Sequence, residues 1–404
     1  MSQHSGAPRK GYSQAAKTAV QQTAARVREM HGAIAGQTFG VLKKVPVIST
    51  PARLIERAHD GISALVYQAI QHSAAASASA AGLYEQQRLQ QRPEKPQSRL
   101  ASALQGALNG VFGDHLQSDN NRLAIDMILR LHGRSLLADA ASLREAFPGA
   151  GGRVCLFLHG LCCDEHCWQP DPKRAEQIDL VSHLEQALGC HALYLRYNSG
   201  LPITENGRQL AQLLQQLVEN WPEPDLELVI IGHSMGGLVA RSAIEQAAAA
   251  GLGWPFATHM LVSIGTPYDG SPVERVGEAI TRALGASDLT APLGRLAASR
   301  SQGIQDLRQG PGPAREVPGH GHIAYRFIAS SLAEDVTHPL ASVFGDGLVP
   351  LASASGHALD GDVQVAQLGG LGHMGLLTDA RVLALLLAWL DESGWHRVAA
   401  DEGR

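Results

Sequence analysis

The sequence predicts an α/β fold with a mostly parallel sheet and helices on both faces. From residue 154 onward, short apolar runs typical of buried strands alternate with amphipathic helical patterns. A serine bracketed by glycines directly follows one of these runs, in the segment Ile-Ile-Gly-His-Ser-Met-Gly-Gly at residues 230–237. The expected strands are Val154–Leu158, Ala192–Tyr197, Leu226–Ile231, Met260–Ile264, Ala324–Ala329 and Val363–Leu368. The expected helices are about Arg174–Leu188, Thr204–Glu219, Met235–Ala250 and Leu376–Asp391.

A cluster of helix and strand breakers at residues 147–152 divides the chain near residue 150. We expect a basic, Ala/Gln-rich helical region over 1–100 and a helical lead-in and linker over 101–150, with a helical block at Arg99–Arg130. The catalytic domain is expected over 151–395, followed by a tail at 396–404. A segment at about 268–320 is expected as a cap or lid insert, and the sequence leaves open whether it moves.

Composition excludes several classes of protein. The 404 residues are 45% hydrophobic and carry a formal charge of −5, which is too mild to indicate binding to nucleic acid. No run approaches the 18 apolar residues of a membrane span, and the amino terminus lacks the apolar core of a signal peptide. We therefore expect a cytoplasmic protein; its oligomeric state is left open.

Residues 1–100 differ in charge from the rest, with 13 Lys/Arg against 5 Asp/Glu. Apolar residues from Leu54 to Ile70 follow helical spacing along one face, flanked by Arg53 and Arg57. Such a segment can lie on an anionic membrane or a lipid particle. The alternative, which we favour, is that this face packs on its own domain or on a second chain.

The five cysteines are odd in number, and four of them fall between Cys155 and Cys167. This distribution favours reduced thiols over a secreted disulfide framework. Cys162, Cys163, His166 and Cys167 together suggest zinc ligands, but their spacing matches no standard zinc finger. We therefore expect neither a metal nor a cofactor, and leave the redox state of these thiols open.

The glycine-bracketed serine has the form of a nucleophile elbow, a sharp turn between a strand and a helix. Ser234 would be lifted clear of the backbone there, with Gly232 and Gly236 leaving room for the turn. The following helix would direct its first amides at developing negative charge. A plain Gly-Ser turn without chemistry is the alternative.

The remaining groups of a catalytic triad follow in order. The strand Val154–Leu158 leads into His159-Gly160-Leu161, a loop on which an oxyanion amide is expected. Asp346 lies in a turn between two glycines, and His373 lies on a glycine-rich loop after the last strand. The order serine, acid, histidine is that of the α/β-hydrolases.

The chain resembles α/β-hydrolases of the lipase and esterase kind over about residues 150–395. The motifs Gly-His-Ser-Met-Gly-Gly, His-Gly-Leu, Gly-Thr-Pro-x-x-Gly-Ser and Asp-Gly-Leu-Val-Pro are similar to those of bacterial triacylglycerol lipases and GPI inositol-deacylase-like hydrolases. The resemblance implies Ser234 as nucleophile, Asp346 as acid and His373 as base. It also implies that the amides of Leu161 and Met235 form the oxyanion hole.

Other residues compete for these roles. The rival acids are Asp335, Asp360 and Asp362, and the rival bases are His320, His322 and His357. His159 and His233 flank the site by motif, and hydrogen-bonded structural roles suit them better than proton transfer. We expect hydrolysis of lipid-like or other apolar esters; acyl transfer to an alcohol or thiol and a non-catalytic binding module are the alternatives.

Overall fold

The fold comes from a computed structural model. The structure describes residues 99–118, 124–149, 151–223, 225–270, 301–309, 321–338, 341–342, 345–355 and 361–396. The chain forms two compact units, Met1–Leu108 and Asn109–Arg404. Helix α3 (Arg99–Ser118) crosses the division between them. The second unit contains the sheet and all the candidate site residues.

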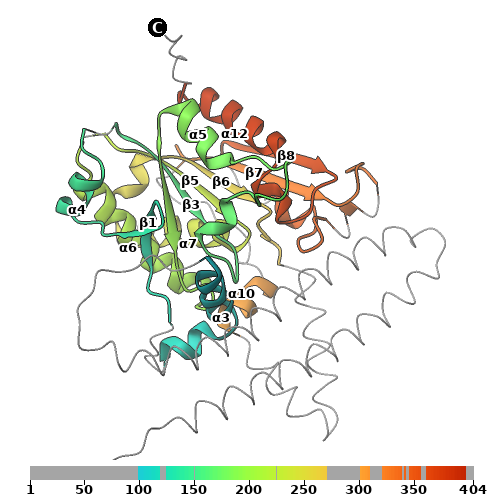
Figure 1. Cartoon of the computed structure of the whole chain (residues 1–404), viewed down its shortest axis with the longest axis horizontal. Helices are drawn as coiled ribbons and strands as arrows, with labels where there is room; N and C mark the ends of the chain where they lie inside the picture. Colours follow the sequence, from blue (N-terminus) through green and yellow to red (C-terminus); the bar gives the residue numbers. More distant parts are fainter. Residues whose placement is uncertain are drawn as a thin grey trace, which may run out of the picture. The chain divides into compact units, whose positions relative to one another are not determined.

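A single eight-stranded sheet forms the centre of the second unit, in the order β2-β1-β4-β3-β5-β6-β7-β8 (Figure 1). Strands β3 to β8 pair in parallel, whereas β1 pairs antiparallel with β2 and β4. This mostly parallel sheet with helices, α/β-hydrolase-like in its topology, confirms the predicted fold class. The strands are β1 (Ile128–Leu131), β2 (Arg134–Leu136), β3 (Arg153–Leu158), β4 (His191–Arg196), β5 (Glu227–His233), β6 (Thr258–Ile264), β7 (Ala324–Ser331) and β8 (Val363–Gly369).

Helices cover both faces of the sheet because its central strands are apolar on both sides. In β3, Leu156 and Leu158 pack into one core, with α4, α6 and α7. Cys155 and Phe157 point the other way, into a core shared with α5 and α12. The helices are α4 (Ala140–Ala146), α5 (Leu180–Leu188), α6 (Ile203–Asn220), α7 (Met235–Ala250), α10 (Gln302–Gln309) and α12 (Ala380–Glu392). Short 3-10 turns are η1 (Glu165–Trp168), η2 (Trp254–Ala257), η3 (Ser353–Ser355) and η4 (Gly375–Leu377).

The prediction of a helical block over Arg99–Arg130, which overlaps the lead-in expected at 101–150, is wrong for the last residues of the block. Helix α3 ends at Ser118, and β1 begins at Ile128. Strands β1 and β2 form a hairpin whose two loop residues, His132 and Gly133, have φ of 48° and 76°. Positive φ at both loop positions matches the right-handed twist of the strands. The hairpin joins the main sheet through β4, so the sheet extends to the amino-terminal side of residue 150.

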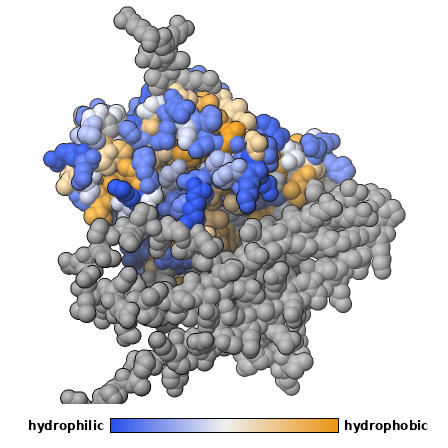
Figure 2. All heavy atoms as spheres, in the orientation of Figure 1, coloured by the Kyte–Doolittle hydropathy of each residue, from blue (hydrophilic) through white to orange (hydrophobic). Residues whose placement is uncertain are grey.

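The basic amphipathic segment expected within residues 1–100 lies outside the described residues. So do His320, His357, Asp360, most of the expected insert and most of the tail. Among the described residues, no helix combines the length and the apolar character required to cross a bilayer. Hydrophilic and hydrophobic residues are interspersed on the face of the described part shown in Figure 2.

Candidate active site

Ser234 occupies the sharp turn between β5 and α7. Its φ of 54° and ψ of −124° place a non-glycine residue in a disfavoured region of backbone conformation. The turn is held by hydrogen bonds, because the Ser234 amide donates to the Ile264 carbonyl at 2.8 Å. A side chain at Gly232 would collide with the Gly237 amide, and one at Gly236 would lie 2.6 Å from the Leu158 carbonyl oxygen. Both positions therefore need glycine for the elbow to form.

Asp346 and His373 form a buried pair. Asp346 Oδ2 lies 2.7 Å from His373 Nδ1, and the two side chains are 1% and 6% exposed. Asp346 Oδ1 accepts from the amides of Leu348 and Val349 at 2.9 and 2.8 Å. A carboxylate only accepts hydrogen bonds, so Nδ1 of His373 carries the hydrogen and Nε2 is left basic.

The elbow and the acid–histidine pair meet at the carboxyl end of β6. Ser234 is bonded to Ile264, the last residue of that strand. The next residue, Gly265, has a φ of 57°, and a Cβ there would lie 3.2 Å from Asp346 Oδ2 and 3.3 Å from His373 Cε1. His233, which precedes the serine, has its ring centroid 4.5 Å from that of His373. The fold thus brings all three predicted triad residues to one end of the sheet.

His159 and His233 are buried histidines with structural hydrogen bonds. The His159 ring stacks on Tyr197 at 4.3 Å, and its Nδ1 lies 2.9 Å from the Gly160 carbonyl oxygen. His233 Nε2 lies 3.2 Å from the carbonyl oxygen of His373. Burial lowers the pKa of His159 and lowers that of His233 well below its ordinary value, and the neighbouring His373 lowers the pKa of His233 further. Both rings are therefore neutral near pH 7.

The two amides expected to form an oxyanion hole approach the serine from different elements. Met235 begins α7 directly after Ser234, and Leu161 lies on the loop after β3. A Cβ on Gly160 would lie 3.0 Å from Ser234 Cβ, so this loop passes beside the nucleophile. Neither amide has an acceptor among the described residues. Both amides are therefore available to a developing oxyanion.

The rival residues that the structure describes are engaged elsewhere. Asp362 pairs with Arg326 at 2.9 Å, and Asp335 accepts from the backbone and hydroxyl of Thr337 on an exposed turn. His322 Nε2 lies 3.0 Å from the Pro255 carbonyl oxygen. None of these three groups contacts the Asp346–His373 pair in any described interaction.

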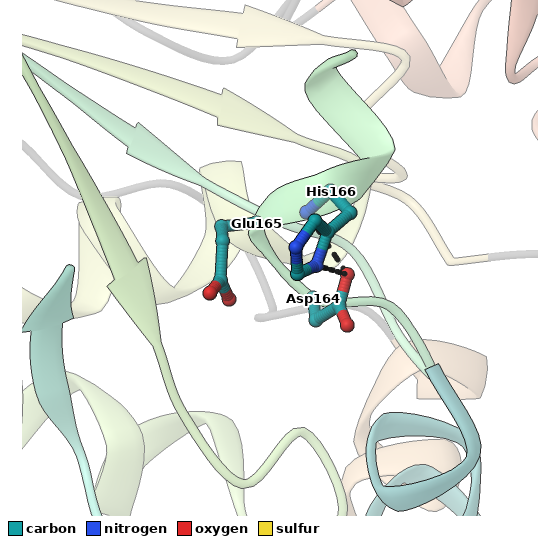
Figure 3. A group of neighbouring side chains, drawn as sticks. All are labelled: Asp164, Glu165 and His166. Carbon is teal, nitrogen blue, oxygen red and sulfur yellow. Dashed lines mark hydrogen bonds and ion pairs between the residues drawn. The ribbon is translucent and has the colours of Figure 1, made fainter. Parts of the chain in front are cut away.

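One group of side chains has the spacing of metal ligands within the described part of the chain: Asp164, Glu165 and His166. In Figure 3, Asp164 and His166 face one another, and Nδ1 of His166 lies 3.2 Å from Asp164 Oδ1. Glu165 is instead held by two buried guanidinium groups, those of Arg130 and Arg196. These arginines already neutralise its charge, so the set is a poor fit for a cation.

Several polar residues near the loop after β3 were not singled out by sequence. The Tyr197 hydroxyl donates to the His159 carbonyl at 2.7 Å, and the Ser199 hydroxyl oxygen accepts from the Cys162 amide at 3.1 Å. Both follow β4, within the segment Tyr-Asn-Ser-Gly at residues 197–200. These residues could have been identified from the sequence, because several hydrogen-bonding residues directly follow an expected buried strand, and sites in such sheets lie beyond the carboxyl ends of the strands.

Comparison with known proteins agrees with the resemblance seen in the sequence. Residues 150–283 match the family model of the PGAP1-like alpha/beta domain. No curated protein matches the chain.

Solved structures with a similar fold include a lipase and an esterase from bacteria. A Bacillus licheniformis lipase in its mature form is 16% identical, with a TM-score of 0.41 over 60% of this chain and 93% of its own. An esterase from Thermogutta terrifontis is 15% identical, with a TM-score of 0.37 over 60% and 91%. The MenH protein of S. aureus is also 15% identical, with a TM-score of 0.36 over 61% and 97%.

Proposed function

We propose that this protein is a serine hydrolase that cleaves carboxylic esters through an acyl-enzyme. The observation that carries the proposal is the buried pair of Asp346 and His373 beside the strained elbow of Ser234. A histidine oriented by a carboxylate, next to a serine raised on a tight turn, is the arrangement that activates a hydroxyl group.

In this mechanism, Nε2 of His373 accepts the proton of Ser234 as the hydroxyl oxygen attacks the ester carbonyl. The negative charge that develops on the carbonyl oxygen is stabilised by the amides of Leu161 and Met235. His373 then protonates the leaving alcohol, and afterwards activates the water that opens the acyl-enzyme. Asp346 keeps the imidazole in the required tautomer and stabilises its positive charge without taking the proton.

We propose apolar or lipid-like acyl groups as substrates. Three apolar side chains lie next to the site: Met235 and Leu376 are buried, and Met374, next to His373, is 44% exposed. The same triad serves acyl transfer to an alcohol or thiol, because the choice depends on which acceptor reaches the acyl-enzyme. Adding graded concentrations of a short alcohol during turnover measures that choice directly.

The test is Ser234→Ala, assayed on p-nitrophenyl esters of increasing acyl length and by labelling with a fluorophosphonate probe. We expect this variant to lose labelling and to lose turnover by several orders of magnitude, because the proposed acyl-enzyme forms on the Ser234 hydroxyl oxygen. The matched control is Ser393→Ala, which also removes a serine hydroxyl. That hydroxyl donates to the Leu390 carbonyl at the end of α12 and takes no part in the proposed mechanism. Turnover or labelling that survives in Ser234→Ala would remove Ser234 as the nucleophile.

A further inference from the structure

The loop that carries the Leu161 amide contains a strained turn. The Cys163 amide donates to the Gly160 carbonyl at 3.3 Å, so residues 160–163 form a β-turn with Leu161 and Cys162 at its centre. Cys162 has a φ of 61°, in the left-handed region that is normally occupied by glycine or asparagine. Positive φ at this third position, without positive φ at Leu161, indicates a type II turn. A cysteine there adopts the required conformation only when its surroundings enforce it.

A buried hydroxyl group supplies such a contact. Ser199, which is 1% exposed, accepts the hydrogen bond of the Cys162 amide at 3.1 Å. This amide belongs to the Leu161–Cys162 peptide, whose orientation distinguishes a type II turn from a type I turn. If the peptide flipped, the Cys162 amide would turn away from Ser199 and the hydrogen bond would be lost.

Ser199 is itself held firmly by its neighbours. Gly200 donates to the Asn198 side chain at 3.1 Å, and Asn198 donates to the Gly113 carbonyl of α3 at 2.9 Å. The Gly303 amide of α10 donates to the Gly200 carbonyl at 3.0 Å. The Ser199 hydroxyl, which accepts from the Cys162 amide, therefore lies on a segment that is hydrogen-bonded to both α3 and α10.

We propose that Ser199 is a positioning residue for the oxyanion hole. Its hydroxyl holds the left-handed turn at Cys162 and so keeps the neighbouring Leu161 amide directed at the site. The inference rests on the proposed ester hydrolysis. Because the oxyanion forms only in the tetrahedral intermediate and the transition states that flank it, and not in the bound ester, loss of this positioning lowers kcat and leaves KM nearly unchanged.

The test compares Ser199→Ala in three backgrounds. In the natural background we expect kcat to fall about tenfold, near the upper end of what one net hydrogen bond contributes. With Cys162→Gly, Ser199→Ala should cost less than about threefold, because glycine takes the left-handed conformation without help. With Cys162→Ala, which lacks the thiol but keeps the strain, the tenfold cost should return. The remote Ser393→Ala substitution is the control for the loss of a serine hydroxyl.

A second measurement does not depend on turnover. Amide hydrogen exchange of the segment 159–168 should be faster in Ser199→Ala than in the natural protein, with little change elsewhere in the sheet. Unchanged exchange, a rise in KM alone, or an equal loss of kcat in the Cys162→Gly and Cys162→Ala backgrounds would each overturn the positioning role. A natural protein that neither labels nor hydrolyses esters would instead refute the proposed function, while the exchange measurement would still report on the turn.

Discussion

Replacing Asp346 with asparagine tests the orientation of the candidate base most directly. The two oxygens of Asp346 have separate partners: Oδ1 accepts two backbone amides, and Oδ2 faces His373 Nδ1. In Asp346→Asn, the amide oxygen must take the Oδ1 position, because an NH₂ group cannot accept from backbone amides. The NH₂ group then faces His373 and donates to Nδ1, which moves the imidazole hydrogen to Nε2. The proposed base at Nε2 is thereby lost.

The expected loss is large because the wrong tautomer removes general-base catalysis. The corresponding change in serine-protease triads lowers kcat by about 10⁴, equivalent to about 5 kcal/mol of barrier. Folding should be preserved, since the asparagine oxygen can keep the bonds to Leu348 and Val349. The measurement is kcat and KM for a p-nitrophenyl ester, with circular dichroism to check the fold.

The matched control is Asp335→Asn, in which the same chemical change is made on an exposed turn, where the side chain accepts from Thr337. We expect this variant to stay within about twofold of the natural kcat, because exposed surface changes rarely propagate. If Asp346→Asn retained kcat within tenfold of the natural protein, the assignment of Asp346 as the acid would be refuted.

Two further predictions concern stability. Glu165→Gln leaves the buried guanidinium groups of Arg130 and Arg196 without their counter-charge. We therefore expect the free energy of unfolding to fall by about 3–5 kcal/mol. An unchanged midpoint of urea unfolding would contradict this prediction. Acid should also destabilise the fold, because burial lowers the pKa of His159 and His233 in the folded state. Below about pH 6.5 the unfolded chain binds protons that the folded chain does not, so each histidine contributes a slope of up to about 1.4 kcal/mol per pH unit. Urea unfolding at pH 8.0, 6.5 and 5.5 measures this slope, and equal stabilities would refute it.

Sequence patterns were sufficient to predict the parallel part of the sheet. The central strands β3, β5 and β6 are nearly continuous apolar runs, because they are buried on both faces between layers of helices. The edge strand β8 is only partly buried and alternates glutamine with apolar residues. The elbow at Ser234 was predictable for a related reason, since a glycine-bracketed serine directly after such a run leaves few structural alternatives. The hairpin of β1 and β2 was missed because its strands are four and three residues long and include charged side chains. Its two-residue His132-Gly133 loop was the available signal.

The hydrogen bonds that could not be predicted from the sequence join residues that are far apart along the chain. Ser199 and Cys162 are 37 residues apart, and Glu165 lies 35 and 31 residues from its two arginines. No local periodicity specifies which hydroxyl accepts from which amide, because that pairing depends on how the loops after β3 and β4 pack together. The left-handed conformation of Cys162 was hidden for the same reason: its residue type predicts an ordinary φ, and tertiary contacts override that preference.

The described residues of the expected insert at 268–320 attach to the fold at two places, at its start and at residues 301–303. At its start, the Tyr268 and Asp269 amides donate to the carbonyl and hydroxyl oxygens of Ser353. Within the insert, the Ser301 hydroxyl donates to the Gly110 carbonyl of α3, and the Gly303 amide of α10 donates to the Gly200 carbonyl, next to Ser199. The insert therefore departs after β6, which contacts the elbow, and residues 301–303 within it attach beside the segment that carries Ser199. A substitution at either attachment should alter turnover through these supports, even without contacting the substrate.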